Sequence, residues 1–116
     1  MILIKMKAKK MKTRIFDIPI SNLNEEELID GVIKLLHSED KSLVCYSNIH
    51  TLNLAYVDTY FKKILRSSKI NLVDGYGVKY LSNLILCNKI KSALTPPSWI
   101  NKFYSKLQPK TKIFFI

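Results

Sequence analysis

A carboxylate and two glycines stand together in the stretch KINLVDGYGVKYL, residues 69–81. Asp74 directly follows an apolar run, and Gly75, Tyr76 and Gly77 come after it. A carboxylate in this position could act as a general base or bind a sugar or ribose hydroxyl, while backbone N–H groups beside the glycines bind an anion. It could equally cap the next helix, with glycine supplying a positive φ. The stretch is not a dinucleotide-binding fingerprint, because the third glycine of that motif is missing.

A second polar cluster, YSNIH, occupies residues 46–50. Asn48 could hydrogen-bond a polar ligand through its amide or cap a helix, and both uses stay open at this point. One amide and His50 are too few ligands for a metal site, so neither a metal nor a cofactor is expected. Cys45 lies inside an apolar run, which argues against a nucleophilic pair with His50. Thr95 precedes two prolines, and it either introduces a rigid helix start or turns its hydroxyl towards a pocket.

Apolar periodicity and capping residues predict where the helices lie. Asn24 has the position of an N-cap, and Glu27 completes a capping box with it. The expected helices start near Asn24, near residue 51, at Asp58 or Thr59, at residue 77 and at Ser98. Side chains on the predicted inner faces include Leu28, Leu36, Leu52, Tyr56, Tyr60, Ile64, Leu65, Val78 and Leu84.

Short apolar runs predict strands over residues 12–20, 42–46, 69–73 and 112–116. Strands that alternate with helices favour a parallel α/β sheet with flanking helices, in which the last three runs are neighbours. In such sheets, ligands bind at the carboxyl ends of the strands. We therefore expect Asn48 and Asp74 at the same sheet edge, close enough to share one pocket.

Positive charge is concentrated at the start of the chain. The formal net charge is +10, and six lysines and arginines fall within the first fourteen residues. We predict a basic tail over residues 1–13 and one α/β domain over residues 14–116. The tail is either a solvated terminus or a surface for anionic lipid or nucleic acid. Because no nucleic-acid-binding motif accompanies the charge, specific nucleic-acid binding is not expected.

The ordered set of motifs resembles the WecG/TagA/CpsF family of bacterial glycosyltransferases. The likeness rests on SNIHTLNLAY, on FKKILRSSKINLVDGYGVKYL, on a threonine-containing loop before a helix and on a final KIFFI, and it runs from residue 14 onwards. The resemblance implies a Rossmann-like fold. It also implies transfer of a sugar, often N-acetylmannosamine, from a UDP donor to a polyprenyl-diphosphate-linked amino sugar, with inversion and without a metal.

The resemblance also implies roles for individual residues. Asp74 falls on the proposed base of the family's D-G-x-G, and Asn48 falls on the asparagine of its T-x-N. Tyr46 stands where the family has threonine. Thr95 matches the threonine of the family's Arg-x-Thr-Gly, while alanine and proline replace the arginine and the glycine. The substrate-binding residues implied in this way are Asn48, Gly75, Tyr76, Gly77 and Thr95.

These inferences converge on an inverting glycosyltransferase in cell-wall or surface polysaccharide synthesis. The expected partners are a UDP-sugar, a lipid-linked acceptor and an anionic membrane face, and a homo-oligomer stays open. With no spanning run and no signal peptide in view, a cytoplasmic position, peripheral to the inner face of the membrane, is expected. The domain is expected to be truncated at its C-terminus and inactive as a fragment. The alternatives are a non-catalytic α/β binding module or remnant and, third, a basic nucleic-acid-binding domain.

Overall fold

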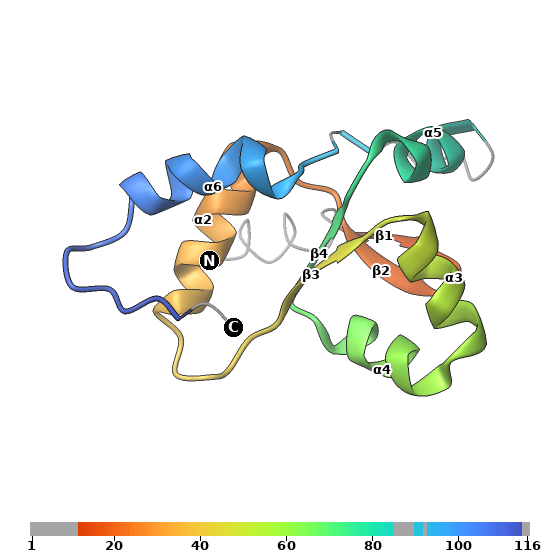
Figure 1. Ribbon diagram of the computed structural model, residues 1–116, viewed down its shortest axis with the longest axis horizontal. Coiled ribbons are helices and arrows are strands. Elements are labelled where there is room, and N and C mark those ends of the chain that lie inside the picture. Colours follow the sequence, from red (N-terminus) through yellow and green to blue (C-terminus); the bar gives the residue numbers. More distant parts are fainter. Residues whose placement is uncertain (1–11, 85–89, 92, 115–116) are drawn as a thin grey trace, which may run out of the picture.

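The computed structural model describes residues 12–84, 90–91 and 93–114 and has a mixed α/β architecture (Figure 1). The strands in this part are β1 (Lys12–Ile15), β2 (Ile18–Ser21), β3 (Val44–Ser47) and β4 (Ile70–Val73). The helices are α2 (Glu25–Leu36), α3 (Ile49–Val57), α4 (Thr59–Ser67), α5 (Tyr76–Leu84) and α6 (Pro96–Ser105). The α/β class is confirmed, while the Rossmann-like topology stays a prediction.

Strands β3 and β4 form a parallel pair, as the sequence predicts for these two runs. Val44 pairs with Ile70, and Ser47 pairs with Val73 at the carboxyl ends. All four residues of β4 are buried, whereas most of β3 is only half-buried. The pair therefore brings the polar clusters that follow each strand to one edge.

The expected single strand over residues 12–20 is instead a hairpin, in which β1 pairs antiparallel with β2. Phe16 and Asp17 form its two-residue loop, with φ of 49° and 65°. Positive φ at both positions is what a type I′ hairpin loop requires, and it is uncommon outside glycine and asparagine or aspartate. Asp17 also pairs with Arg14 at 2.5 Å and with Arg66 at 3.0 Å, which ties the loop to α4. Apolar patterning alone does not reveal such a turn.

A buried polar residue joins the hairpin to the parallel pair. Asn71 is 2% exposed, and its Oδ1 accepts a hydrogen bond of 2.8 Å from the Ser47 hydroxyl. Its Nδ2 donates to the Pro19 carbonyl at 3.2 Å, and its backbone N–H donates to the Ser21 hydroxyl at 3.1 Å. The Asn71 side chain therefore forms hydrogen bonds with both β3 and β2, a role that the apolar sequence KINLV does not predict.

The helix caps follow the local sequence closely, with one exception. The capping box of Asn24 and Glu27 is present, and Asp58 caps α4 by accepting from two backbone N–H groups. The predicted start at Ser98 is wrong, because α6 begins at Pro96 with Thr95 as the N-cap residue. Proline has a helical φ and needs no N–H partner, so it fits the first turn of a helix. Ser98 lies inside that turn and donates its hydroxyl to the Thr95 carbonyl at 2.7 Å.

Two apolar clusters form the core, and the helices that carry them lie on opposite sides of the parallel pair, α2 and α6 on one side and α3, α4 and α5 on the other (Figure 1). The first joins the hairpin to α3, α4 and α5, and includes Leu52, Leu65 and Val78. The second joins β4 to α2 and α6, and includes Leu28, Leu72 and Trp99. Several side chains predicted to be buried are instead exposed, because no described element covers their side of the helix; these are Leu36, Tyr56, Tyr60, Ile64 and Leu84.

The predicted strand at the end of the chain is wrong for its described part. Residues 111–114 have no regular structure, Phe114 is 84% exposed, and residues 115–116 lie outside the described part. Helix α6 packs against α2, and Leu107 and Thr111 line a hollow beside the C-terminal end of α2. The chain after α6 therefore lies beside α2, and of the predicted strand, Ile113 and Phe114 pair with no described strand.

Candidate functional site

Asn48 and Asp74 lie at the same edge of the parallel pair, as predicted. Each is the first residue after its strand, and the last residues of the strands, Ser47 and Val73, are register partners. The Asp74 backbone N–H donates to the Ser47 carbonyl at 3.1 Å, which continues the ladder beyond the strands. The two residues therefore follow neighbouring strand ends, at the position where α/β sheets bind ligands.

Strand alternation places Tyr46 on the same face of the sheet as these two side chains. Val44 and Tyr46 pack against the α2–α6 cluster, whereas Cys45 packs against the other one. Asn48 is also extended, with φ −102° and ψ −179°, so the alternation carries on to it. Asp74 stands two residues beyond Leu72, a member of the α2–α6 cluster. The candidate site therefore belongs to the sheet face that α6 covers.

Asn48 caps α3, which was one of its two predicted uses. Its Oδ1 accepts from the Thr51 backbone N–H at 2.9 Å and from the Thr51 hydroxyl at 3.0 Å. The side chain is exposed, and its Nδ2 donates to none of the described residues. The cap fixes the side chain and leaves its two N–H donors for a ligand.

Asp74 does not cap α5 in the described structure. The helix begins at Tyr76, Gly75 stands between them, and no described group donates to the half-buried Asp74 carboxylate. Gly75 has φ +87°, so the predicted need for a positive φ is confirmed. A Cβ at Gly75 would meet nothing within 4 Å, which shows that backbone conformation rather than space selects glycine there.

The two glycines of this turn are expected to respond differently to alanine. Gly75→Ala should lower the free energy of unfolding by about 1–2 kcal/mol, because a left-handed residue with a Cβ is strained. Gly77→Ala is the matched control, because Gly77 lies inside α5 and its added Cβ would make an ordinary 3.6 Å contact with Ile49 of α3. Urea unfolding of both variants checks this. Equal losses would contradict the conformational explanation.

Tyr46 lies two residues before Asn48 in the candidate site, and the sequence marked it only as a departure from the family pattern. The Trp99 indole N–H, in the first turn of α6, donates to the Tyr46 hydroxyl at 3.1 Å. Burial raises the pKa of the Tyr46 phenol, the bond from Trp99 lowers it, and the negative charge of Asp74 raises it further. The alternation of SLVCY towards Asn48 was the available signal, because it places Tyr46 and Asn48 on one face.

The other predicted residues are less closely tied to this edge. Tyr76 is exposed and stacks near Tyr80, with ring centroids 6.2 Å apart. Thr95 is exposed, and its hydroxyl forms no hydrogen bond with any described residue. No described hydrogen bond links Thr95 to Asp74. Burial raises the pKa of the Cys45 thiol, only partly offset by a bond with Ser68, so the thiolate is disfavoured.

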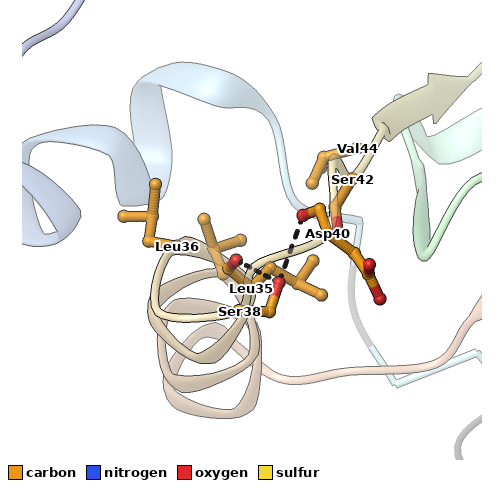
Figure 2. Close-up of a pocket in the computed structure, with 7 residues that line it drawn as sticks. Leu35, Leu36, Ser38, Asp40, Ser42 and Val44 are labelled. Atoms are coloured by element: carbon orange, nitrogen blue, oxygen red, sulfur yellow. Dashed lines mark hydrogen bonds between the residues drawn. The ribbon is translucent and has the colours of Figure 1, made fainter.

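A hollow of about 280 Å³ lies away from these residues, between the end of α2 and the start of β3 (Figure 2). Ser38 lines it and donates its hydroxyl to the backbone carbonyls of Leu35 and Asp40. Since β3 begins at Val44, this hollow borders the amino end of the strands, and the candidate site borders the carboxyl end.

Among the described helices, none is long and apolar enough to cross a membrane.

Fold and site together define an α/β protein that presents a carboxylate and an amide where parallel strands end. Comparison with known protein families matches residues 13–116 to the glycosyl transferase WecG/TagA/CpsF family. The chain belongs to this family, which confirms the resemblance and implies a glycosyltransferase of surface polysaccharide synthesis. A comparison with individual curated proteins finds no match.

Proposed function

We propose that the protein transfers a sugar from a UDP donor, such as UDP-N-acetylmannosamine, to a polyprenyl-diphosphate-linked sugar. Family membership supports the reaction class. The observation that carries the site assignment is the Asp74 carboxylate, which receives no hydrogen bond from the described residues and lies beside Asn48. A carboxylate that the fold does not use is available to take a proton from a substrate.

In the proposed reaction, Asp74 removes the proton of the acceptor hydroxyl as its oxygen attacks the anomeric carbon. The bond from that carbon to the diphosphate oxygen breaks, and UDP leaves with the electron pair. Attack from the face opposite the leaving group inverts the anomeric configuration. The proton ends on Asp74 and passes to solvent after product release.

The neighbouring groups have supporting roles in this proposal. The side-chain N–H donors of Asn48 hold an oxygen of the donor sugar or of the acceptor. The backbone N–H groups of Gly75, Tyr76 and Gly77 lie at the start of α5, where the helix dipole favours an anion. Thr95 supplies a hydroxyl from the start of α6. The test is sugar transfer from a UDP-sugar to a polyprenyl-diphosphate acceptor, compared with binding of UDP alone.

A non-catalytic binding module is the second candidate. Its support is that the hollow seen beside α2 is remote from Asp74. A chain that binds a UDP-sugar in a saturable manner but never consumes it would favour this second function. Steeply salt-dependent binding to RNA or DNA, without any UDP binding, would instead favour the nucleic-acid alternative.

Membrane contact is part of the proposal and has support from the corner between α3 and α4. Tyr56, Val57 and Tyr60 are 76%, 75% and 73% exposed there, and Lys63 lies exposed one turn along α4. Aromatic and basic side chains together are typical of surfaces that meet anionic lipid headgroups. The basic residues before Phe16 add positive charge, worth about 1 kcal/mol for each cation near the lipid.

We expect salt-sensitive binding to anionic vesicles that weakens about tenfold in the double variant Tyr56→Ser/Tyr60→Ser. Tyr80→Ser, at an exposed position of α5, is the control and should bind like the parent protein. Co-sedimentation with anionic and neutral vesicles measures both. Equal binding to the two kinds of vesicle would count against electrostatic contact.

A further inference from the structure

Tyr46 carries a hydroxyl that the fold holds on one side only. Its oxygen accepts the indole N–H of Trp99 at 3.1 Å, and no described group accepts the hydroxyl proton. A phenol proton stays near the plane of its ring, so an indole on one side directs the proton to the other. The half-buried Tyr46 is therefore an oriented donor without an acceptor in the part of the chain that the structure describes.

The position of this donor connects it with the candidate site. Tyr46 pairs with Leu72 in the parallel register, and each strand reaches the edge residue, Asn48 or Asp74, two positions later. Burial raises the pKa of the Tyr46 phenol, and the negative charge of Asp74 adds to this, which is consistent with the register that places the two residues near each other. The carboxylate, the amide and the phenol therefore line one stretch of the same sheet face.

The charge of Asp74 restricts what the phenol can bind. A diphosphate placed at Tyr46 would be repelled by the neighbouring carboxylate, and a single phenol donor does little to offset that repulsion. At the start of α5, several backbone N–H groups and the helix dipole do offset it. A neutral oxygen, such as a sugar hydroxyl or the carbonyl of an N-acetyl group, has no such penalty. The site therefore favours a sugar at Tyr46, with the diphosphate farther away.

We propose that the Tyr46 hydroxyl donates a hydrogen bond to a neutral oxygen of the donor sugar, and so discriminates a UDP-sugar from UDP. The inference rests on the proposed function and deepens it, since it assigns a sugar subsite within the same face. Trp99, in α6, orients the hydroxyl of Tyr46 and does not itself contact the sugar.

The experiment compares Tyr46→Phe with the parent chain by calorimetric titration with UDP-N-acetylmannosamine and with UDP. The expected result is a roughly 2- to 10-fold loss of affinity for the UDP-sugar, the range for one neutral hydrogen bond, and no change for UDP. Tyr104→Phe, a half-buried tyrosine of α6, is the matched control and should change neither. Trp99→Phe retains the phenol and should retain most of the affinity for the UDP-sugar.

Each other outcome overturns a distinct statement. If Tyr46→Phe weakens the binding of UDP and of the UDP-sugar equally, the phenol does not recognise the sugar. If Trp99→Phe lowers the affinity for the UDP-sugar as much as Tyr46→Phe does, the Tyr46–Trp99 pair only positions α6, and the proposed hydrogen bond from Tyr46 to the sugar is wrong. If Tyr46→Phe binds both ligands like the parent, the subsite is absent while the proposed function stands. A parent chain that binds neither ligand removes the proposed function and the subsite together.

Discussion

In a form of the protein that transfers sugar, including one extended beyond residue 116, Asp74→Asn is expected to abolish most of the transfer while leaving the fold and the binding of UDP intact. An amide cannot accept the acceptor's proton at neutral pH, and one well-placed general base is worth about 10²–10⁴ in rate. Stability should change little, because no described group donates to the carboxylate and α5 begins only after Gly75. Initial rates of transfer, with calorimetric UDP titration and thermal unfolding on the same samples, measure the three properties.

Asp40→Asn is the matched control for this substitution. Asp40 is an exposed carboxylate that lines the hollow at the amino end of β3, remote from the candidate site. It should transfer sugar at the rate of the parent protein. A fully active Asp74→Asn protein would remove Asp74 from the role of base, and a protein that loses UDP binding in step with transfer would show a role in binding instead.

Asn71→Ala is expected to cause the largest loss of stability among the substitutions considered. It removes the acceptor of the Ser47 hydroxyl and the donor to the Pro19 carbonyl, two groups joined to Asn71 at 2.8 Å and 3.2 Å. Leaving buried polar groups without partners costs about 1–3 kcal/mol each, so for these two groups we expect a loss of about 2–6 kcal/mol in the free energy of unfolding.

Asn53→Ala provides the same chemical change at an exposed position of α3 and should be close to neutral. Urea unfolding of the two variants compares them directly. A loss below about 0.5 kcal/mol for Asn71→Ala would mean that water replaces the amide, and that the hairpin does not depend on it.

Much of the local structure was predictable because its causes lie within a few residues of one another. The capping box of Asn24 and Glu27 and the cap at Asp58 depend on backbone N–H groups two or three positions away. The glycine after Asp74 likewise predicted a positive φ from the type of a single residue. The adjacency of Asn48 and Asp74 also followed, because parallel strands that alternate with helices end at one edge.

The apolar pattern was a poorer guide to burial than to secondary structure. Leu28, Leu52 and Leu65 are buried as their periodicity predicts, whereas Tyr56, Tyr60 and Leu84 are exposed on helices that the same periodicity located correctly. Periodicity reports which side chains share a face of a helix. It does not report whether a second element covers that face.

By itself, the sequence determined the α/β class of the fold, most helix starts, the parallel pair and the position of Asn48 and Asp74 at one edge of that pair. Only the tertiary structure decided that residues 12–21 turn back as a hairpin, that Asn71 joins two sheets and that Thr111 lines a hollow beside α2. It also decided that Trp99 holds the hydroxyl of Tyr46. The physical reason is the range of the interactions: caps and turns are made by neighbours in the chain, whereas a buried amide or an indole–phenol pair joins residues that are roughly fifty positions apart and meet only in the packed molecule.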